Sequence, residues 1–156
     1  MKGYLDSGIS PMLKHYGPHG NPLGGLNLAS VDCGLYDLHA VYLKPFEMVL
    51  RHLPVYAVMS TYNSWNRIPN SASRYLLTDI LRDRWGFKGY VYSDWGAIEM
   101  LETFHHTAAN KAEAAIQALT AGLDVEASSE CYPELFRLGK EGNLDKSYID
   151  TAVRRV

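Results

Sequence analysis

The chain has 156 residues, a formal net charge of -2, a hydrophobic fraction of 47% and a charged fraction of 21%. This balance is typical of a globular domain, and it argues against a nucleic-acid partner because the densest basic pair is Arg154–Arg155. The longest apolar stretches are too short to cross a bilayer, so no membrane partner is expected.

The first half of the sequence predicts two strand-then-helix units. The first strand approaches Lys14 and His15, and a loop rich in Gly, Pro and Asn follows it. A helical region is predicted at 35–53, divided by Pro45, because proline suits the first turn of a new helix. The second strand is predicted at 55–60.

A polar loop at 61–70 leads into the helix of the second unit. This helix is expected to begin near Ser71 or Ser73, either of which can cap it, and to stop at Gly86. The remaining predicted elements are a strand at 90–93, a helix at 108–121, a strand at 123–126, and helices at 133–140 and 146–155.

The strand centres Ala57, Val91 and Val125 are 34 residues apart each time (91 − 57 and 125 − 91). Strands that alternate with helices predict an α/β fold with a parallel sheet. Four such units correspond to the partial (β/α)8 TIM-type barrel of a half-length domain. A flavodoxin-like open sheet is the alternative, although no strand is followed by a phosphate loop or dinucleotide fingerprint.

The sequence contains no sign of a cofactor or a metal site. Cys33 and Cys131 are far apart and lack metal-ligand spacing, so two free thiols are expected. The N-terminal segment 1–6 lacks the apolar core of a signal peptide. Localisation therefore stays undetermined, with a periplasmic or secreted parent protein as one alternative.

Chemically active residues follow the ends of the predicted strands, where a β/α barrel places its active site. The segment 89–96 ends a strand at Asp94 and continues with Trp95. A carboxylate beside an aromatic ring can be aimed at a sugar as a nucleophile. The alternative is an Asp that caps the next helix. The other strand-end residues are Lys14, His15, Met59, Tyr62 and Glu126.

Several motifs occur in the order found in one known family. They are Lys14-His15-Tyr16, 24–27 (GGLN), 45–47 (PFE), 58–63 (VMSTYN), 76–82 (LLTDILR), 85–89 (WGFKG), 93–95 (SDW) and 121–126 (AGLDVE). Together they resemble glycoside hydrolase family 3, of the β-glucosidase and β-xylosidase type. The resemblance runs from about Lys14 to the C-terminus and corresponds to the C-terminal half of a catalytic barrel.

The resemblance implies a retaining mechanism with Asp94 as the nucleophile, acting on a β-linked oligosaccharide or glycoside. It implies that Trp95 is a platform beside the sugar ring and that Lys14 and His15 hydrogen-bond sugar hydroxyls. Tyr62 resembles the family tyrosine near the nucleophile.

The weaker assignments are Met59, on the same strand end as Tyr62, and Glu126, which is a supporting partner of the site, a helix cap or a solvated side chain. For the other residues the plainer alternatives are a solvated Lys14, a structural His15 and a packing role for Met59 or Tyr62.

The resemblance also defines what is missing. The family's first half-barrel lies upstream, and its general acid/base often comes from a domain after the barrel. One branch of the family uses a His in a loop with Asp-Ser-His, but His19 lacks that context and is expected to be a loop residue. Residues 1–156 are therefore interpreted as a fragment of the catalytic barrel domain of a glycosidase, and this fragment alone is expected to be inactive. An inactive remnant or a non-catalytic sugar-binding module is the alternative.

Overall fold

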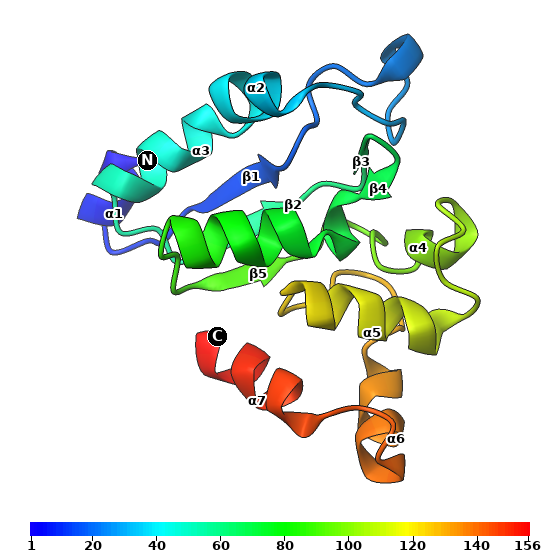
Figure 1. Ribbon diagram of the computed structural model, residues 1–156. Coiled ribbons are helices and arrows are strands. Elements are labelled where there is room, and N and C mark those ends of the chain that lie inside the picture. The colour runs from blue at the N-terminus through cyan, green and yellow to red at the C-terminus, as the bar shows by residue number, and fades with distance from the viewer.

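A computed structural model describes all residues of the chain, 1–156. Its centre is a parallel sheet in the order β1-β2-β5, formed by β1 (Met12–Tyr16), β2 (Ala57–Ser60) and β5 (Tyr90–Tyr92) (Figure 1). All three strands were predicted from the sequence, and the observed sheet is open. Val58 pairs with Val91 in register, and both are buried because the sheet is covered by helices.

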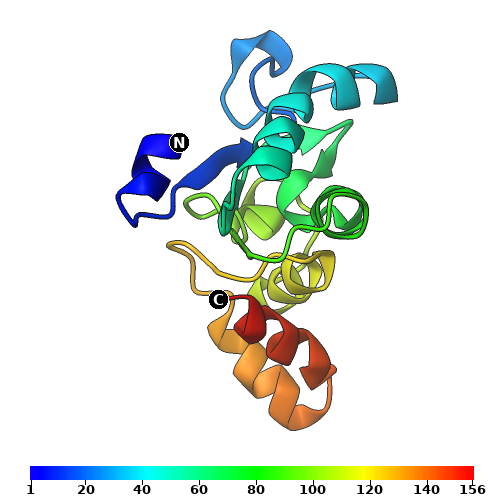
Figure 2. The same ribbon diagram turned by 90° about the vertical axis from the view of Figure 1, so that its left-hand side faces the viewer.

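The helices follow the predicted alternation with strands. They are α1 (Lys2–Asp6), α2 (Leu35–Asp37), η2 (Leu38–Tyr42), α3 (Lys44–His52), η4 (Tyr75–Arg84), α4 (Met100–Thr103), α5 (Lys111–Ala121), α6 (Pro133–Glu141) and α7 (Lys146–Arg155). Figure 2 shows α3, η4 and α5 along one side of the sheet, with α6 and α7 together at the C-terminal end. No helix combines the length and the apolar character needed to cross a membrane.

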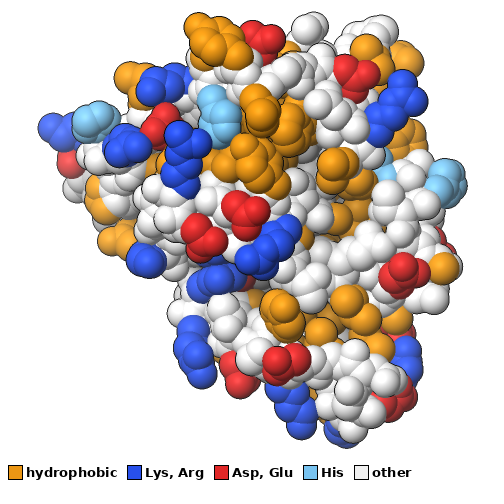
Figure 3. Space-filling view, in the orientation of Figure 1, with side chains coloured by type: hydrophobic (Ala, Val, Ile, Leu, Met, Phe, Trp, Pro, Cys, Tyr) orange, Lys and Arg blue, Asp and Glu red, His pale blue; other side chains and the backbone are white.

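The core extends from the sheet and η4 to α5, α6 and α7. Leu76, Leu77, Ile80 and Leu81 lie on η4 and are buried. Figure 3 shows positive and negative side chains mixed over one face of the molecule, with hydrophobic side chains gathered toward α2 and α3. The mixture agrees with the absence of a basic run in the sequence.

Local capping decides where two helices begin. The helix predicted to start near residue 108 begins at Lys111, because the Asn110 side chain accepts a hydrogen bond from the Glu113 amide at 3.0 Å. The predicted cap Ser73 accepts from the Leu76 amide at 3.3 Å, just before η4. Gly122 ends α5 with φ 112°, a left-handed conformation that favours glycine.

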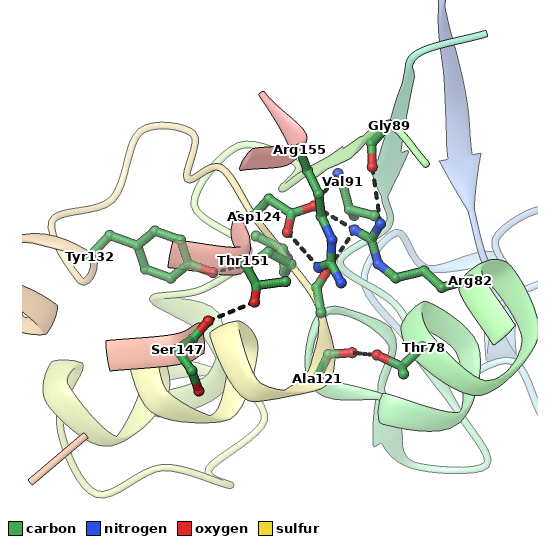
Figure 4. Close-up of polar contacts among 12 residues, drawn as sticks. Thr78, Arg82, Gly89, Val91, Ala121, Asp124, Tyr132, Ser147, Thr151 and Arg155 are labelled. Atoms are coloured by element: carbon green, nitrogen blue, oxygen red, sulfur yellow. Dashed lines mark hydrogen bonds and ion pairs between the residues drawn. The ribbon is translucent and has the colours of Figure 1, made fainter. Parts of the chain in front are cut away.

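The prediction of a fourth strand at 123–126 is wrong. Only Val125 forms a bridge, to Tyr92. The reason is that the Asp124 carboxylate accepts the Val91 N–H at 2.8 Å, so a side chain takes the position of a strand carbonyl (Figure 4). The same carboxylate also pairs with Arg82 and Arg155.

The predicted loop at 61–70 contains an antiparallel hairpin, β3 (Ser64–Trp65) and β4 (Ile68–Pro69). Its turn residues, Asn66 and Arg67, have φ values of 47° and 70°. A two-residue hairpin turn needs this backbone, which glycine usually supplies. Because neither turn residue is a glycine, the sequence pattern did not predict a hairpin here.

Gly89 is expected to tolerate no side chain. A Cβ at this position would lie 2.1 Å from the Tyr56 carbonyl oxygen, which accepts the Tyr90 N–H at 3.0 Å. Gly89→Ala should therefore separate β5 from the segment before β2 and lower the free energy of unfolding by about 3 kcal/mol. Urea unfolding measures this effect. Gly3→Ala, at a site with no atom within 4 Å, is the matched control and should change stability little.

Candidate active site

Asp94 lies two residues beyond the end of β5 and is only 6% exposed. Its Oδ1 accepts the Trp95 backbone N–H at 2.7 Å, whereas its Oδ2 is buried without a hydrogen-bond partner. A buried carboxylate oxygen without a donor is rare, and such groups concentrate at functional sites. The helix-cap alternative does not describe Asp94, because the next helix, α4, begins only at Met100.

His15 faces the free oxygen of Asp94. Its Nε2 atom lies 3.3 Å from Asp94 Oδ2, within ion-pair distance but without the alignment of a hydrogen bond. The β1–β2 register shifts between Leu13 and Tyr16, so this part of the strand is released from regular pairing. Burial lowers the pKa of His15, the Asp94 charge opposes that shift, and His19 and Lys14 lower the pKa further. A neutral imidazole is therefore favoured here.

Tyr62 reaches the same carboxylate from the segment after β2. Burial raises the pKa of its phenol, and the nearby Asp94 charge raises it further. Its backbone carbonyl accepts a hydrogen bond from His105 Nε2 at 2.8 Å, which ties this segment to the loop after α4. Asp94, His15 and Tyr62 are thus brought together from three adjacent strand ends, as parallel strands require.

The other sequence candidates are not in contact with Asp94 through their side chains. Lys14 is exposed and lies on the wall of a shallow hollow beside β1. Met59 is half-buried within β2, paired in register with Tyr92. The Trp95 side chain is 71% exposed, and only its backbone N–H meets the carboxylate. An exposed indole next to a buried carboxylate leaves a flat apolar surface open to a ligand.

Glu126 has the capping role that was one of its alternatives. Its carboxylate accepts hydrogen bonds from the Ser129 hydroxyl at 2.7 Å and from the Cys131 and Tyr132 amides at 2.9 Å. These contacts precede α6 and occupy both carboxylate oxygens. The Glu126 carboxylate is therefore engaged in these capping contacts.

His19 was expected to be a plain loop residue, but it lies against the site. Its ring centroid is 4.6 Å from that of His15, and its Nδ1 atom contacts Thr61 and Asn63. Sequence reasoning missed these contacts because they depend on how the loop after β1 folds over the end of β2. The motif alone gives no signal for them.

Chemically, the arrangement combines an anionic oxygen with a phenol, an imidazole and an exposed indole. Such a set can hold a polyhydroxylated ligand and attack an electrophilic carbon. The structure contains no group of three His, Cys, Asp or Glu side chains placed to hold a metal ion, and both cysteines are free thiols.

Comparisons with known proteins agree with this geometry. The model of the glycosyl hydrolase family 3 N-terminal domain matches residues 1–156. The chain is 38% identical over 149 residues to a periplasmic β-glucosidase of Salmonella typhimurium, covering 95% of the chain and 19% of that protein. It is 36% identical over 138 residues to an exo-1,4-β-xylosidase of Emericella nidulans, covering 85% and 18%.

Solved structures give the same result. A β-glucosidase from Erythrobacter marinus aligns with a TM-score of 0.92 and 34% identity. A β-glucosidase from Listeria innocua, in complex with glucose, aligns with a TM-score of 0.89 and 32% identity. Each alignment covers 94% of this chain and 20% of the solved chain. The chain thus spans about a fifth of the length of the relatives it matches.

Proposed function

Because the chain belongs to glycosyl hydrolase family 3, we propose that it carries the nucleophile of an exo-acting, retaining β-glycosidase. The observation that supports this function most directly is the Asp94 carboxylate, with Oδ1 held by a backbone N–H and Oδ2 buried and unpartnered. A fixed carboxylate with one free oxygen has the form that nucleophilic attack on a sugar requires.

In the proposed reaction, Asp94 Oδ2 attacks the anomeric carbon as the bond to the leaving oxygen breaks. A general acid gives a proton to that oxygen, and a glycosyl ester of Asp94 remains. Water, deprotonated by the same group acting as a base, then attacks the anomeric carbon and releases the sugar and the free carboxylate. The net retention of configuration follows from two successive inversions.

Five neighbouring residues are proposed to bind the sugar in the first subsite: Lys14, His15, Met59, Tyr62 and Trp95. A neutral His15 can donate its Nε2–H to a hydroxyl next to the reacting carbon, and Tyr62 can donate its phenol proton. Trp95 offers its exposed indole face to the apolar face of a pyranose. Lys14, which is exposed, would line the solvent side of this subsite, and Met59, which is half-buried, would line its inner side.

The proposed substrates are β-glucosides or β-xylosides, since the relatives include both β-glucosidases and β-xylosidases. We further propose that residues 1–156 form the C-terminal half of a β/α barrel. The remaining strands and a following domain would then be the partners that complete the pocket. The coverage of about a fifth of the relatives' length supports this division.

A second candidate function is sugar binding without turnover. The Asp94 charge raises the pKa of both His15 and Tyr62, which places this one carboxylate at the site. The Glu126 carboxylate is engaged in its capping contacts. A retaining enzyme needs a second carboxyl group about 5–5.5 Å from the first. Turnover of aryl β-glycosides by the chain itself, at the rate of a full-length relative, would contradict this second candidate.

The nucleophile assignment is tested by trapping the ester. The complete parent protein that contains this chain is incubated with 2-deoxy-2-fluoro-β-glucosyl and β-xylosyl fluorides, whose leaving group departs without a proton, and is then digested and mapped by mass spectrometry. We expect the label on the peptide that contains Asp94. A label on any other residue, or equal labelling of an Asp94→Asn variant, would overturn the assignment.

A further inference from the structure

His19 makes more specific contacts than a loop histidine requires. Its Nδ1 atom lies 2.8 Å from Thr61 Oγ1 and 2.5 Å from Asn63 Oδ1, both at the end of β2. Thr61 and Asn63 are completely buried, so these contacts are shielded from competing water. The loop after β1 is thereby joined to the segment that carries Tyr62.

The surrounding hydrogen bonds fix the proton on His19. The Asn63 amide nitrogen donates to the Ala29 carbonyl at 2.7 Å, so its Oδ1 must be the acceptor toward His19. The Thr61 hydroxyl already donates to the same oxygen at 2.7 Å. His19 therefore carries its proton on Nδ1, and in the neutral ring Nε2 is unprotonated.

The ring anchored in this way lies against His15. The two ring centroids are 4.6 Å apart with an interplanar angle of 40°. Rotation about the last side-chain bond of a histidine has a broad energy profile, so neighbouring atoms must define the orientation of the ring. His15 has no hydrogen bond that fixes its ring, and its Nε2 lies 3.3 Å from the free oxygen of Asp94.

We propose that His19 is a positioning residue: its Nδ1–H, held by Thr61 and Asn63, fixes its ring against His15 and so keeps His15 Nε2 at Asp94 Oδ2. The importance of this position for glycoside cleavage rests on the proposed function, whereas the coupling between the two histidines does not. The titratable groups whose charge acts on the pKa of His15 are Asp94, His19 and Lys14.

The test uses the complete parent protein with two substitutions that remove different features of His19. His19→Phe keeps a ring beside His15 but removes the Nδ1–H donor, and His19→Asn keeps a donor near the place of Nδ1 but removes the ring. Long-range ¹H–¹⁵N spectra across a pH series report the tautomer and the pKa of each histidine. The rate of labelling by a 2-fluoro glycosyl fluoride is measured in parallel, with exposed His52→Phe as the matched control.

We expect His19 of the unmodified chain to be the Nδ1–H tautomer and His15 to titrate below 6.5. Both substitutions should lower the pKa of His15, because its ring is no longer held beside the Asp94 charge that raises that pKa, and should slow labelling by about tenfold. His52→Phe should change neither quantity. A purely structural role would lower the melting temperature and leave the pKa of His15 and the labelling rate of the folded protein unchanged.

An Nε2–H tautomer at His19 in the unmodified chain would overturn the proposal, and this measurement needs no variant to fold. An unchanged pKa of His15 in a folded His19→Asn protein would overturn it as well. If the chain shows no labelling of Asp94 at all, the proposed function fails, but the tautomer and the pKa of His15 still decide the coupling between the histidines.

Discussion

Asp94→Asn is expected to lower the release of dinitrophenolate from 2,4-dinitrophenyl β-glucoside or β-xyloside by about 10⁴-fold or more. The amide cannot form the glycosyl ester, while it keeps the volume of the carboxylate and an oxygen that can accept the Trp95 N–H. Dinitrophenolate leaves without protonation, so the assay follows the nucleophile separately from any general acid. The measurement is the burst and steady-state release of dinitrophenolate by the complete parent protein.

The matched control is Asp150→Asn, because Asp150 is exposed on α7 and far along the chain from the site. Its rate should stay within about twofold of the unmodified chain, as expected for a surface substitution. Equal losses in the two variants would show that the charge of the chain, rather than the position of Asp94, governs the rate, and would contradict the assignment.

Chemical rescue separates attack from simple charge stabilisation. Asp94→Gly leaves a space next to the anomeric carbon, and azide added to this variant can enter from the same face. Attack by azide forms one carbon–nitrogen bond as the bond to dinitrophenolate breaks, and the product is an α-glycosyl azide. A β-glycosyl azide, or no rescue in a folded variant that binds the glycoside, would contradict a direct attack by Asp94.

The sequence predicted the three strands of the sheet well, because each is a short run of apolar residues bounded by loop residues. It also predicted that Asp94, His15 and Tyr62 would share one edge, since the ends of parallel strands meet there. That inference needed the strand order only, which the alternation of strands and helices supplies.

The features that the sequence did not predict depend on hydrogen bonds made by side chains. The segment 123–126 has the composition of a strand, but the Asp124 carboxylate takes the Val91 amide and limits the pairing to one bridge. The link from His19 to Thr61 and Asn63 joins positions 42 and 44 residues apart, so no local pattern contains it. The binding of a sugar hydroxyl by Lys14, which is exposed on β1, stays a prediction for a ligand-bound state.

Asp124 is expected to be the side chain whose substitution costs the most stability. Its carboxylate is 1% exposed, and it accepts hydrogen bonds from Arg155 at 2.9 Å, from the Val91 amide at 2.8 Å and from Arg82. The same Arg82 donates to the Gly89 carbonyl at 3.0 Å, so the cluster joins η4 and α7 to the first residues of β5 (Figure 4).

Asp124→Asn should lower the free energy of unfolding by about 3–5 kcal/mol, because it leaves a buried guanidinium without its counter-ion. Arg155→Met should cost less, about 1–2 kcal/mol, because the Arg155 side chain is 26% exposed and water can replace part of its contact. Urea unfolding followed by circular dichroism gives both values. Glu134→Gln, which breaks an exposed pair with Arg137, is the control and should cost under about 1 kcal/mol.

The salt dependence distinguishes the buried cluster from a surface ion pair. Added sodium chloride screens exposed charges far more than buried ones, so the difference between the unmodified chain and Asp124→Asn should persist at 1 M salt. A loss below about 1 kcal/mol, or one that disappears in salt, would contradict a buried ionic link. The cluster binds β5 at Val91, three residues before Asp94. Because Asp124→Asn weakens this contact, the variant should lose labelling of Asp94 at temperatures where the unmodified protein is still labelled.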